Sequence, residues 1–194
     1  MRMDEDLIAT VSRRLRAEEP ADIALRMAAV SVMISEDDKP STLLIMRAQR
    51  EGDPWSGQIA FPGGKSQPGD GSAAKTAARE TREEVGIDLE REGRFLGYAD
   101  AATTHTGTMR VIPCVFALPA RLEVSPNAEV ASHRWVELEG LLSPGAKSAY
   151  SMVVQGKTIS LPAVRVDDYL VWGLTHRIIS TLFGLEEGPG PGKR

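Results

Sequence analysis

Short apolar runs alternate with turn-forming segments along most of the chain. Their length and their β-branched and aromatic content predict strands, which cover residues 26–34, 42–46, 58–61, 94–98, 110–118 and 132–136. The first two runs flank a polar turn, so we expect them to form a hairpin. Pro113 lies inside the fifth run and predicts an edge position or a bulge, because proline has no N–H for the strand ladder. A second hairpin is expected within residues 150–160, around Gln155-Gly156.

Apolar residues at helical spacing predict a helix near each end of the chain. The first covers residues 4–18, with an apolar face made of Leu7, Ile8, Val11 and Leu15. The last is capped by Asp167 or Asp168 and continues to about Phe183, and residues 137–142 form a short helical turn. Strands with helices before, between and after them predict an α/β or α+β fold with a mixed sheet. We expect one domain over residues 1–185 and a disordered tail over residues 186–194.

A glycine-rich loop leads into a third helix, which carries most of the candidate chemistry. Gly63 and Gly64 follow a proline and allow the backbone to bend sharply and to approach a ligand. Ser72 is placed to cap the start of the helix, and Gly86 is placed to close its end. With successive residues about 100° apart, the stripe expected to pack against a sheet consists of Ala74, Ala78, Thr81 and Val85.

A second stripe on this helix consists of Glu80, Glu83 and Glu84. Glu80 and Glu84 are an i,i+4 like-charge pair, and Glu83 and Glu84 lie at the negative end of the helix dipole, so both arrangements weaken the helix. A bound Mg²⁺ would reverse both effects, because hard cations take carboxylate oxygens as ligands. Three glutamates alone fit a solvated acidic turn as well, with Arg79 paired to Glu83. Their fixed spacing from Arg79 and from the glycines favours a metal site.

Composition and charge narrow the class of protein. The net charge of −4 gives no electrostatic reason to expect nucleic acid as a partner. No apolar run approaches the roughly 20 residues of a membrane span, and the N-terminus lacks a signal-peptide pattern. The single cysteine, Cys114, cannot form an intrachain disulfide, and its apolar surroundings predict a buried, unreactive thiol. We therefore expect a cytoplasmic protein with neither nucleic acid nor membrane as a partner, of an oligomeric state that the sequence does not give.

The loop and the helix together resemble the Nudix box of pyrophosphohydrolases. That box combines a glycine, an acidic residue and the pattern Arg-Glu-aliphatic-x-Glu-Glu-x-Gly-aliphatic, and it is a specific motif. Here it is matched by Gly64, Asp70 and residues 79–87. Asp70 replaces a glutamate and lies one residue further from Arg79 than usual, and Thr81 replaces the aliphatic residue. The resemblance implies a Nudix-type α/β/α sandwich with a mixed β-sheet.

The same resemblance implies a divalent-metal site that supports pyrophosphate hydrolysis. Mg²⁺ is the expected ion, with Mn²⁺ as the alternative, and the implied ligands are the Gly63 carbonyl, Glu80, Glu83 and Glu84. Arg79 would orient or neutralise the glutamates. The catalytic base stays open between Glu83 and Glu129, with His105 as a third candidate. Glu129 fits a solvated loop residue equally well.

Residues upstream of the box resemble the coenzyme A pyrophosphatase branch of the Nudix hydrolases. The similar segments are residues 43–50, 56–64 and 171–175, and the second reads Gly-Gln-x-Ala-Phe-Pro-Gly-Gly from Gly57. Residues 51–55 depart from the more basic, histidine-containing pattern that is usual there. The branch implies hydrolysis of CoA, with its esters or oxidised form as further candidates, to 3′,5′-ADP and 4′-phosphopantetheine.

Two other functions compete with this one. The same chemistry could act on another nucleoside diphosphate derivative, such as ADP-ribose or NADH, or the domain could bind a ligand without turnover. A 3′-phosphate needs cationic donors, so Arg47 and Arg50 are candidate substrate-binding residues together with Lys65. The competing interpretation of Arg47 and Arg50 is that they are ordinary loop-surface arginines.

Overall fold

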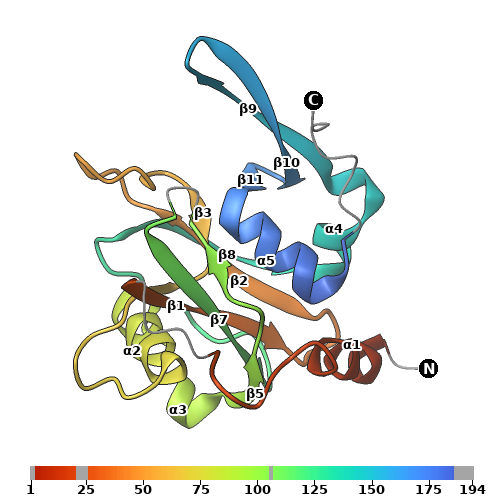
Figure 1. Ribbon diagram of the computed structural model, residues 1–194. Coiled ribbons are helices and arrows are strands. Elements are labelled where there is room, and N and C mark those ends of the chain that lie inside the picture. Colours follow the sequence, from red (N-terminus) through yellow and green to blue (C-terminus); the bar gives the residue numbers. More distant parts are fainter. Residues whose placement is uncertain (1–2, 21–25, 105–106, 186–194) are drawn as a thin grey trace.

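The computed structural model describes residues 3–20, 26–104 and 107–185, and its strands form three sheets (Figure 1). The largest consists, in spatial order, of β4 (Gly63–Lys65), β1 (Arg26–Ser35), β7 (Met109–Leu118) and β5 (Arg94–Tyr98), with β6 (Ala102–Thr103) also paired to β7. Strands β1 and β7 are parallel, whereas the other neighbours are antiparallel. The predicted mixed sheet is therefore confirmed.

The two smaller sheets are antiparallel. The first contains β3 (Ile59–Ala60), β2 (Ser41–Arg47) and β8 (Val130–Glu137). The second contains β11 (Tyr169–Trp172), β10 (Lys157–Val166) and β9 (Lys147–Val154). The hairpin expected within residues 150–160 is confirmed, and it is longer than predicted. Gln155 and Gly156 form its turn with φ values of 51° and 76°, as a tight two-residue turn requires.

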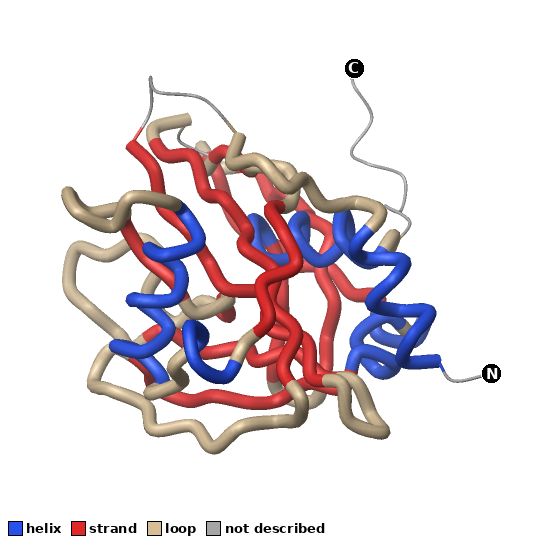
Figure 2. Tube along the Cα trace, turned by 90° about the horizontal axis from the view of Figure 1, so that it is seen from below, coloured by secondary structure: helices blue, strands red, loops and turns tan. Residues whose placement is uncertain are grey.

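Helices cover the strands on both sides (Figure 2). They are α1 (Met3–Ser12), α2 (Ala73–Val85), α3 (Leu89–Glu92), α4 (Leu138–Leu142) and α5 (Gly173–Phe183), with a short 3₁₀ helix η1 (Pro144–Ala146). One apolar cluster joins α2 to Met33 of β1 and Ile112 of β7, and a second joins α1 and α5 to Val32 and Val115 of the same two strands. The strands thus lie between two helical layers. No helix among the described residues is long and apolar enough to cross a bilayer.

The hairpin predicted from the first two apolar runs is wrong. Both runs are strands, but β1 has β7 on one edge and β4 on the other, and β2 belongs to a different sheet. The segment that displaces β2 is Gly63–Lys65, which we expected to be loop. Because the Gly63–Lys65 backbone pairs with β1, the glycine loop is held directly against the central sheet.

Both terminal helices are shorter than predicted. The first ends at Ser12, because the backbone of Arg16 is extended and exchanges two hydrogen bonds of 2.8 and 2.9 Å with Tyr98. The last begins at Gly173, and neither Asp167 nor Asp168 caps it. Residues 169–172 instead form β11, since their backbone groups pair with β10. The predicted tail over residues 186–194 lies outside the described residues.

Pro113 and Cys114 lie in the centre of the sheet. Strand β7 has neighbours on both sides, so an edge position of Pro113 is wrong. The alternative, a bulge, is found nearby in β5 between Phe95 and Gly97, which pair with Phe116 and Val115 and not with Pro113. Pro113 faces the interval between β5 and β6, where its carbonyl accepts a 2.9 Å hydrogen bond from the N–H of Ala99. Its missing N–H therefore interrupts no regular strand pairing on that side. Cys114 is fully buried, and burial raises the pKa of its thiol far above the usual range, as expected for an unreactive cysteine.

Candidate metal and substrate site

Helix α2 has the limits and caps that its sequence predicts. The Ser72 hydroxyl accepts a 3.2 Å hydrogen bond from the N–H of Lys75, and Gly86 closes the helix with φ 77°. Ala78, Thr81 and Val85 are buried, whereas Ala74 is only half-buried. The buried face is wider than the predicted stripe, and its further members are Ala73, Thr76, Ala77 and Glu84.

Thr81, which replaces the aliphatic residue of the motif, is held by a buried hydroxyl pair. Its Oγ1 donates to Ser31 Oγ on β1 at 2.7 Å, and Ser31 Oγ in turn donates to the carbonyl oxygen of Ala77 at 3.1 Å. Both side chains are fully buried. The departure from the motif is thus matched by a second polar residue on the facing strand. The signal in the sequence was a lone serine within the apolar run of β1.

Gly63 and Gly64 are required for two different reasons. Gly63 has φ 152°, and a Cβ there would lie 2.3 Å from the carbonyl oxygen of Ala29 on β1. At Gly64 a Cβ would lie 2.4 Å from the carboxylate carbon of Glu80. Gly63 therefore permits the pairing of β4 with β1, and Gly64 leaves room for a site carboxylate.

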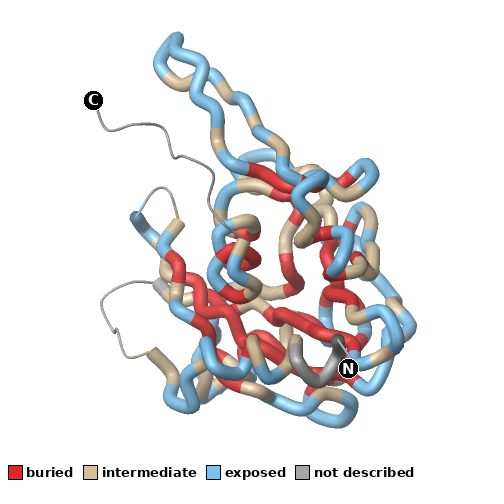
Figure 3. The backbone as a smooth tube through the Cα atoms, turned by 90° about the vertical axis from the view of Figure 1, so that its right-hand side faces the viewer, coloured by how far each residue is buried: buried red, intermediate tan, exposed pale blue. Residues whose placement is uncertain are grey.

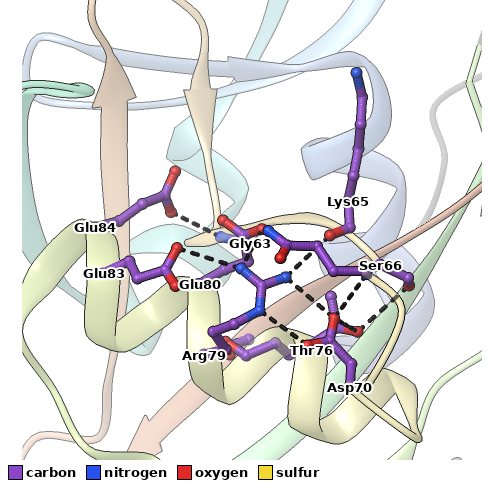
Figure 4. A network of polar contacts seen from close by, with 12 residues as sticks. Gly63, Lys65, Ser66, Asp70, Thr76, Arg79, Glu80, Glu83 and Glu84 are labelled. Carbon is purple, nitrogen blue, oxygen red and sulfur yellow. Dashed lines mark hydrogen bonds and ion pairs between the residues drawn. The ribbon is translucent and has the colours of Figure 1, made fainter.

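Arg79 is the centre of the polar network at this loop (Figure 4). Its Nε and Nη2 donate to the two oxygens of Asp70 at 2.9 and 3.1 Å, and Nη2 also donates to the Lys65 carbonyl oxygen at 3.1 Å. Nη1 donates to Glu80 at 2.9 Å and to Glu83 at 3.2 Å. These five bonds use all five N–H groups of a guanidinium. Arg79 therefore orients the acids and the loop, and in this arrangement it has no donor left for a substrate.

Asp70 supports Arg79 from the loop. It also accepts hydrogen bonds of 2.8 Å from the N–H of Gln67 and from the hydroxyl of Thr76. The hydrogen bonds from Arg79 and Gln67 hold the pKa of Asp70 well below its usual range, so it stays ionised. Reciprocally, the Asp70 carboxylate raises the pKa of the Arg79 guanidinium. The extra residue between Asp70 and Arg79 does not prevent a two-point ion pair.

The three glutamates of α2 differ sharply in environment. Glu84 is 3% exposed, and its Oε2 accepts a 2.8 Å hydrogen bond from the N–H of Gly63. Burial raises the pKa of Glu84 to about 7, although the Gly63 bond and the charge of Arg47 oppose the shift. Burial also raises the pKa of Glu80, against the hydrogen bond from Arg79. The side chain of Glu83 is 52% exposed.

The loop before β8 brings Glu129 to this cluster. Asn127 fastens the loop to the end of α2: its Nδ2 donates to the Glu83 carbonyl oxygen at 2.8 Å, and its backbone N–H donates to the Glu84 carbonyl oxygen at 2.9 Å. Its Oδ1 accepts from the N–H of Glu129 at 2.7 Å. The Glu129 charge contributes to the raised pKa of both Glu80 and Glu84. We did not identify Asn127 from the sequence, although an asparagine two residues before Glu129 is typical of an Asx turn.

The predicted substrate residues take different positions. Arg47, at the end of β2, donates to Asp53 at 2.9 Å, and its Nε is buried without a hydrogen-bond partner. Arg50 donates to Glu129 at 3.0 Å. Arg50 therefore lies beside Glu129, and Arg47 is close enough to Glu84 for its charge to act on that carboxylate. The Lys65 side chain is exposed and extends away from Arg79 (Figure 4), while its carbonyl oxygen is one of the acceptors of Arg79.

The arrangement suits a divalent cation in donor type and in charge. The carboxylates of Glu80, Glu83, Glu84 and Glu129 lie around one end of α2, and Glu84 is buried. Within the described part of the chain, however, no three acidic, histidine or cysteine side chains converge closely enough to hold an ion in this packing. The reason is that Arg79 engages Glu80 and Glu83, while Glu84 turns to Gly63. His105 lies outside the described residues.

Comparison with known proteins identifies the family of this chain. A model of the NUDIX domain matches residues 25–155. An uncharacterized protein of Schizosaccharomyces pombe is 36% identical in an alignment of 160 residues, and the match covers 77% of this chain but 44% of the relative's length. The uncharacterized Nudix hydrolase NudL of Photorhabdus laumondii is 36% identical over 158 residues, covering 81% of this chain and 83% of the relative.

Two solved structures share the fold at low sequence identity. A MutT/nudix family protein from Enterococcus faecalis has a TM-score of 0.55 at 20% identity and covers 84% of this chain and 63% of its own. The NUDIX domain of Shewanella oneidensis NrtR, complexed with ADP ribose, has a TM-score of 0.50 at 19% identity and covers 64% of this chain and 81% of its own. The domain match, the relatives and the shared fold together place this chain in the Nudix family.

Proposed function

We propose that this protein is a divalent-metal-dependent pyrophosphohydrolase that cleaves coenzyme A to 3′,5′-ADP and 4′-phosphopantetheine. The observation that carries the proposal is that a segment resembling the coenzyme A branch lies beside the acidic cluster of α2. Arg50 belongs to this segment, residues 43–50, and it forms an ion pair with Glu129, whose charge acts on Glu80 and Glu84 of α2. In the proposed reaction a water oxygen attacks one phosphorus, and the bridging P–O bond breaks.

The proposed metal ligands are the carboxylates of Glu80, Glu83 and Glu84 and the carbonyl of Gly63. A Mg²⁺ or Mn²⁺ ion held there would neutralise pyrophosphate oxygens and lower the pKa of a bound water. Glu84 favours this role because a buried, ionised carboxylate is costly without a cation. Arg79 is proposed as a positioning residue, since its donors are all engaged with the loop and the acids.

The base that takes the proton from water is proposed to be Glu83 or Glu129. Both carboxylates are about half exposed, and each is paired with an arginine in this packing. Replacing each with Gln and measuring kcat against pH separates them. Loss of the base removes the acidic limb of the profile, whereas loss of a neighbouring charge shifts that limb without removing it.

The second candidate is hydrolysis of another nucleoside diphosphate derivative, such as ADP-ribose or NADH. The observation that favours it is the pairing of Arg47 with Asp53 and of Arg50 with Glu129, which offsets the cationic charge available to a 3′-phosphate. Mass spectrometry of products from CoA, dephospho-CoA, ADP-ribose and NADH in H₂¹⁸O identifies the substrate and the phosphorus attacked. Preference for CoA supports the first candidate, and preference for ADP-ribose or NADH supports the second.

A binding domain without turnover is the third possibility, and Glu84→Gln tests it. We expect the variant to fold and to lose kcat by orders of magnitude, because it removes a proposed ligand while keeping the side chain's shape. Undetectable turnover of every substrate by the wild-type protein would support the binding domain. Unchanged turnover in Glu84→Gln would refute the metal assignment.

The role of the arginines needs its own measurement. We expect Arg47→Ala and Arg50→Ala to raise the KM of CoA more than that of dephospho-CoA, which lacks the 3′-phosphate. Arg47→Ala leaves Asp53 unpaired, so the double variant with Asp53→Asn controls for that charge. An equal change in both KM values would show that the arginines do not distinguish the phosphate.

A further inference from the structure

Strands β9 and β10 extend beyond the body of the protein as a two-stranded arm (Figures 1 and 3). We use the word arm for residues 149–162. Burial decreases steeply along it: Ala163 and Val164 at its base are buried, whereas most residues toward the turn are exposed. An isolated two-stranded hairpin is marginally stable in water, because it has no core of its own. The arm is therefore an element that lacks a packing partner within the described chain.

One face of the arm is apolar except at its tip, where Val154 pairs with Lys157. Directly opposite residues share a face, and on this face Tyr150 pairs with Leu161 and Met152 pairs with Ile159. The face continues to the base, where the ring of Tyr150 stacks on Trp172 with centroids 3.9 Å apart. The other face carries the pairs Ser151–Ser160 and Val153–Thr158. Two of the three large apolar side chains exposed among the described residues belong to the arm, Ile159 (36%) on the apolar face and Val153 (69%) on the other face.

The outer edge of the arm is an unprotected strand. In the sheet order β11-β10-β9, strand β9 has a neighbour on one side only among the strands that the structure describes. Residues 148–156 contain neither a charge nor a proline, the features with which proteins usually protect such edges. The free edge presents backbone N–H and C=O groups that only another strand can satisfy in regular order. The opposite edge of the sheet, β11, lies against β3.

We propose that β9 pairs antiparallel with β9 of a second copy of this chain, about a twofold axis at Ser151. The two three-stranded sheets then form one six-stranded sheet. A twofold axis perpendicular to the sheet keeps both apolar faces on the same side, so Tyr150 lies opposite Met152 of the partner subunit. An aromatic ring beside a thioether is a favourable pair, and no like charges meet along residues 148–154.

Self-pairing is favoured over another strand donor because it closes. The contact is isologous: each copy uses its own β9 edge and covers the β9 edge of the other, so the pairing closes at two chains and does not grow into a fibre. Pairing also gives the arm a neighbour for its whole length. The partner that this surface fits is therefore a second copy.

The test is the mass of the full-length protein in solution, measured by sedimentation over the micromolar range. We expect wild type at twice 21.0 kDa. Met152→Lys places a charge beside the axis and should weaken the dimer about tenfold or more. Thr158→Lys adds the same charge to the same arm, on β10 and on the opposite face, and should leave the dimer intact. A wild-type protein that stays at 21.0 kDa, or an unaffected Met152→Lys dimer, would overturn the proposal.

Chemical cross-linking keeps the test decisive if the lysine variant folds poorly. Ser151→Cys puts two thiols at the twofold axis, and a short bismaleimide should join them into a covalent dimer. Wild type is the matched control, because its single cysteine, Cys114, is buried. Cross-linking of wild type to the same extent, or none in Ser151→Cys, contradicts the proposed pairing.

Discussion

Glu84→Gln should stabilise the metal-free protein, although it removes a proposed metal ligand. In the folded protein burial raises the pKa of Glu84 from 4.5 to about 7. The folded state therefore holds a proton that the unfolded chain has already lost, and the free energy of unfolding falls as the pH rises from about 4.5 to about 7. Above that range the folded state contains an ionised carboxylate that is 3% exposed.

The size of the effect follows from the shift. One pH unit corresponds to about 1.4 kcal/mol, so the ionised carboxylate costs the fold on the order of 3 kcal/mol. Gln keeps an oxygen for the N–H of Gly63 but adds an amide that needs a partner of its own. We therefore expect a gain of about 1–3 kcal/mol at about pH 8 and nearly none at about pH 5.

Urea unfolding in EDTA at both pH values measures this difference. Glu83→Gln is the matched control, since its side chain is 52% exposed and its ion pair contributes less than about 1 kcal/mol. Adding Mg²⁺ should reverse the order of wild type and Glu84→Gln, because only a state that binds the ion gains from it. A Glu84→Gln protein no more stable than wild type at about pH 8 would refute the link between burial and cost.

Three further predictions concern the loop, its acid and the metal. Gly64→Ala should weaken Mg²⁺ binding about tenfold with little loss of stability, because the new Cβ meets only the flexible end of the Glu80 side chain. Gly63→Ala should lower the free energy of unfolding by about 3 kcal/mol or more, because its Cβ meets the backbone of β1. Equal urea midpoints for the two variants would contradict this difference. Asp70→Asn should cost about 2–4 kcal/mol near neutral pH. Because the pKa of Asp70 is lowered in the folded protein, its ionised carboxylate contributes to the free energy of unfolding above pH 3.8, and this contribution is lost as the pH falls further. The free energy of unfolding of Asp70→Asn should therefore lack this decrease in acid. The thermal shift produced by Mg²⁺ should increase as the pH rises through about 7, where Glu84 loses its proton, and a shift independent of pH would exclude Glu84 as a ligand.

The structure also accounts for the sequence departures within the box. Thr81 remains compatible with a buried helix face because Ser31 supplies a hydroxyl on the facing strand. Asp70, though shorter than glutamate and displaced by one residue, reaches Arg79 with both oxygens. Thr81 and Asp70 are therefore each held by identifiable hydrogen bonds, and neither departure alters the Arg-Glu…Glu-Glu core.

Features that depend on neighbouring residues were predictable from the sequence. Helix α2 is capped by Ser72 and Gly86 as predicted, because a capping hydroxyl and a left-handed glycine act within a few residues. The turn at Gln155-Gly156 follows from local backbone preference in the same way. The grouping of Glu80, Glu83 and Glu84 into one stripe of α2 was likewise predicted from their spacing along the helix.

Features that depend on competition between distant segments were decided only by the tertiary structure. Gly63–Lys65 occupies the edge of β1 that we had assigned to β2, because an edge pairs with whichever strand the whole fold brings to it. The same packing buries Glu84 but leaves Glu83 exposed on the same helix turn. Asn127 and Glu129 reach α2 from more than 40 residues away in sequence. The sequence thus determined which acidic side chains α2 carries and how they are spaced along it. Burial and long-range pairing, which only the tertiary structure decided, determined the pKa values and the hydrogen-bond partners of these side chains.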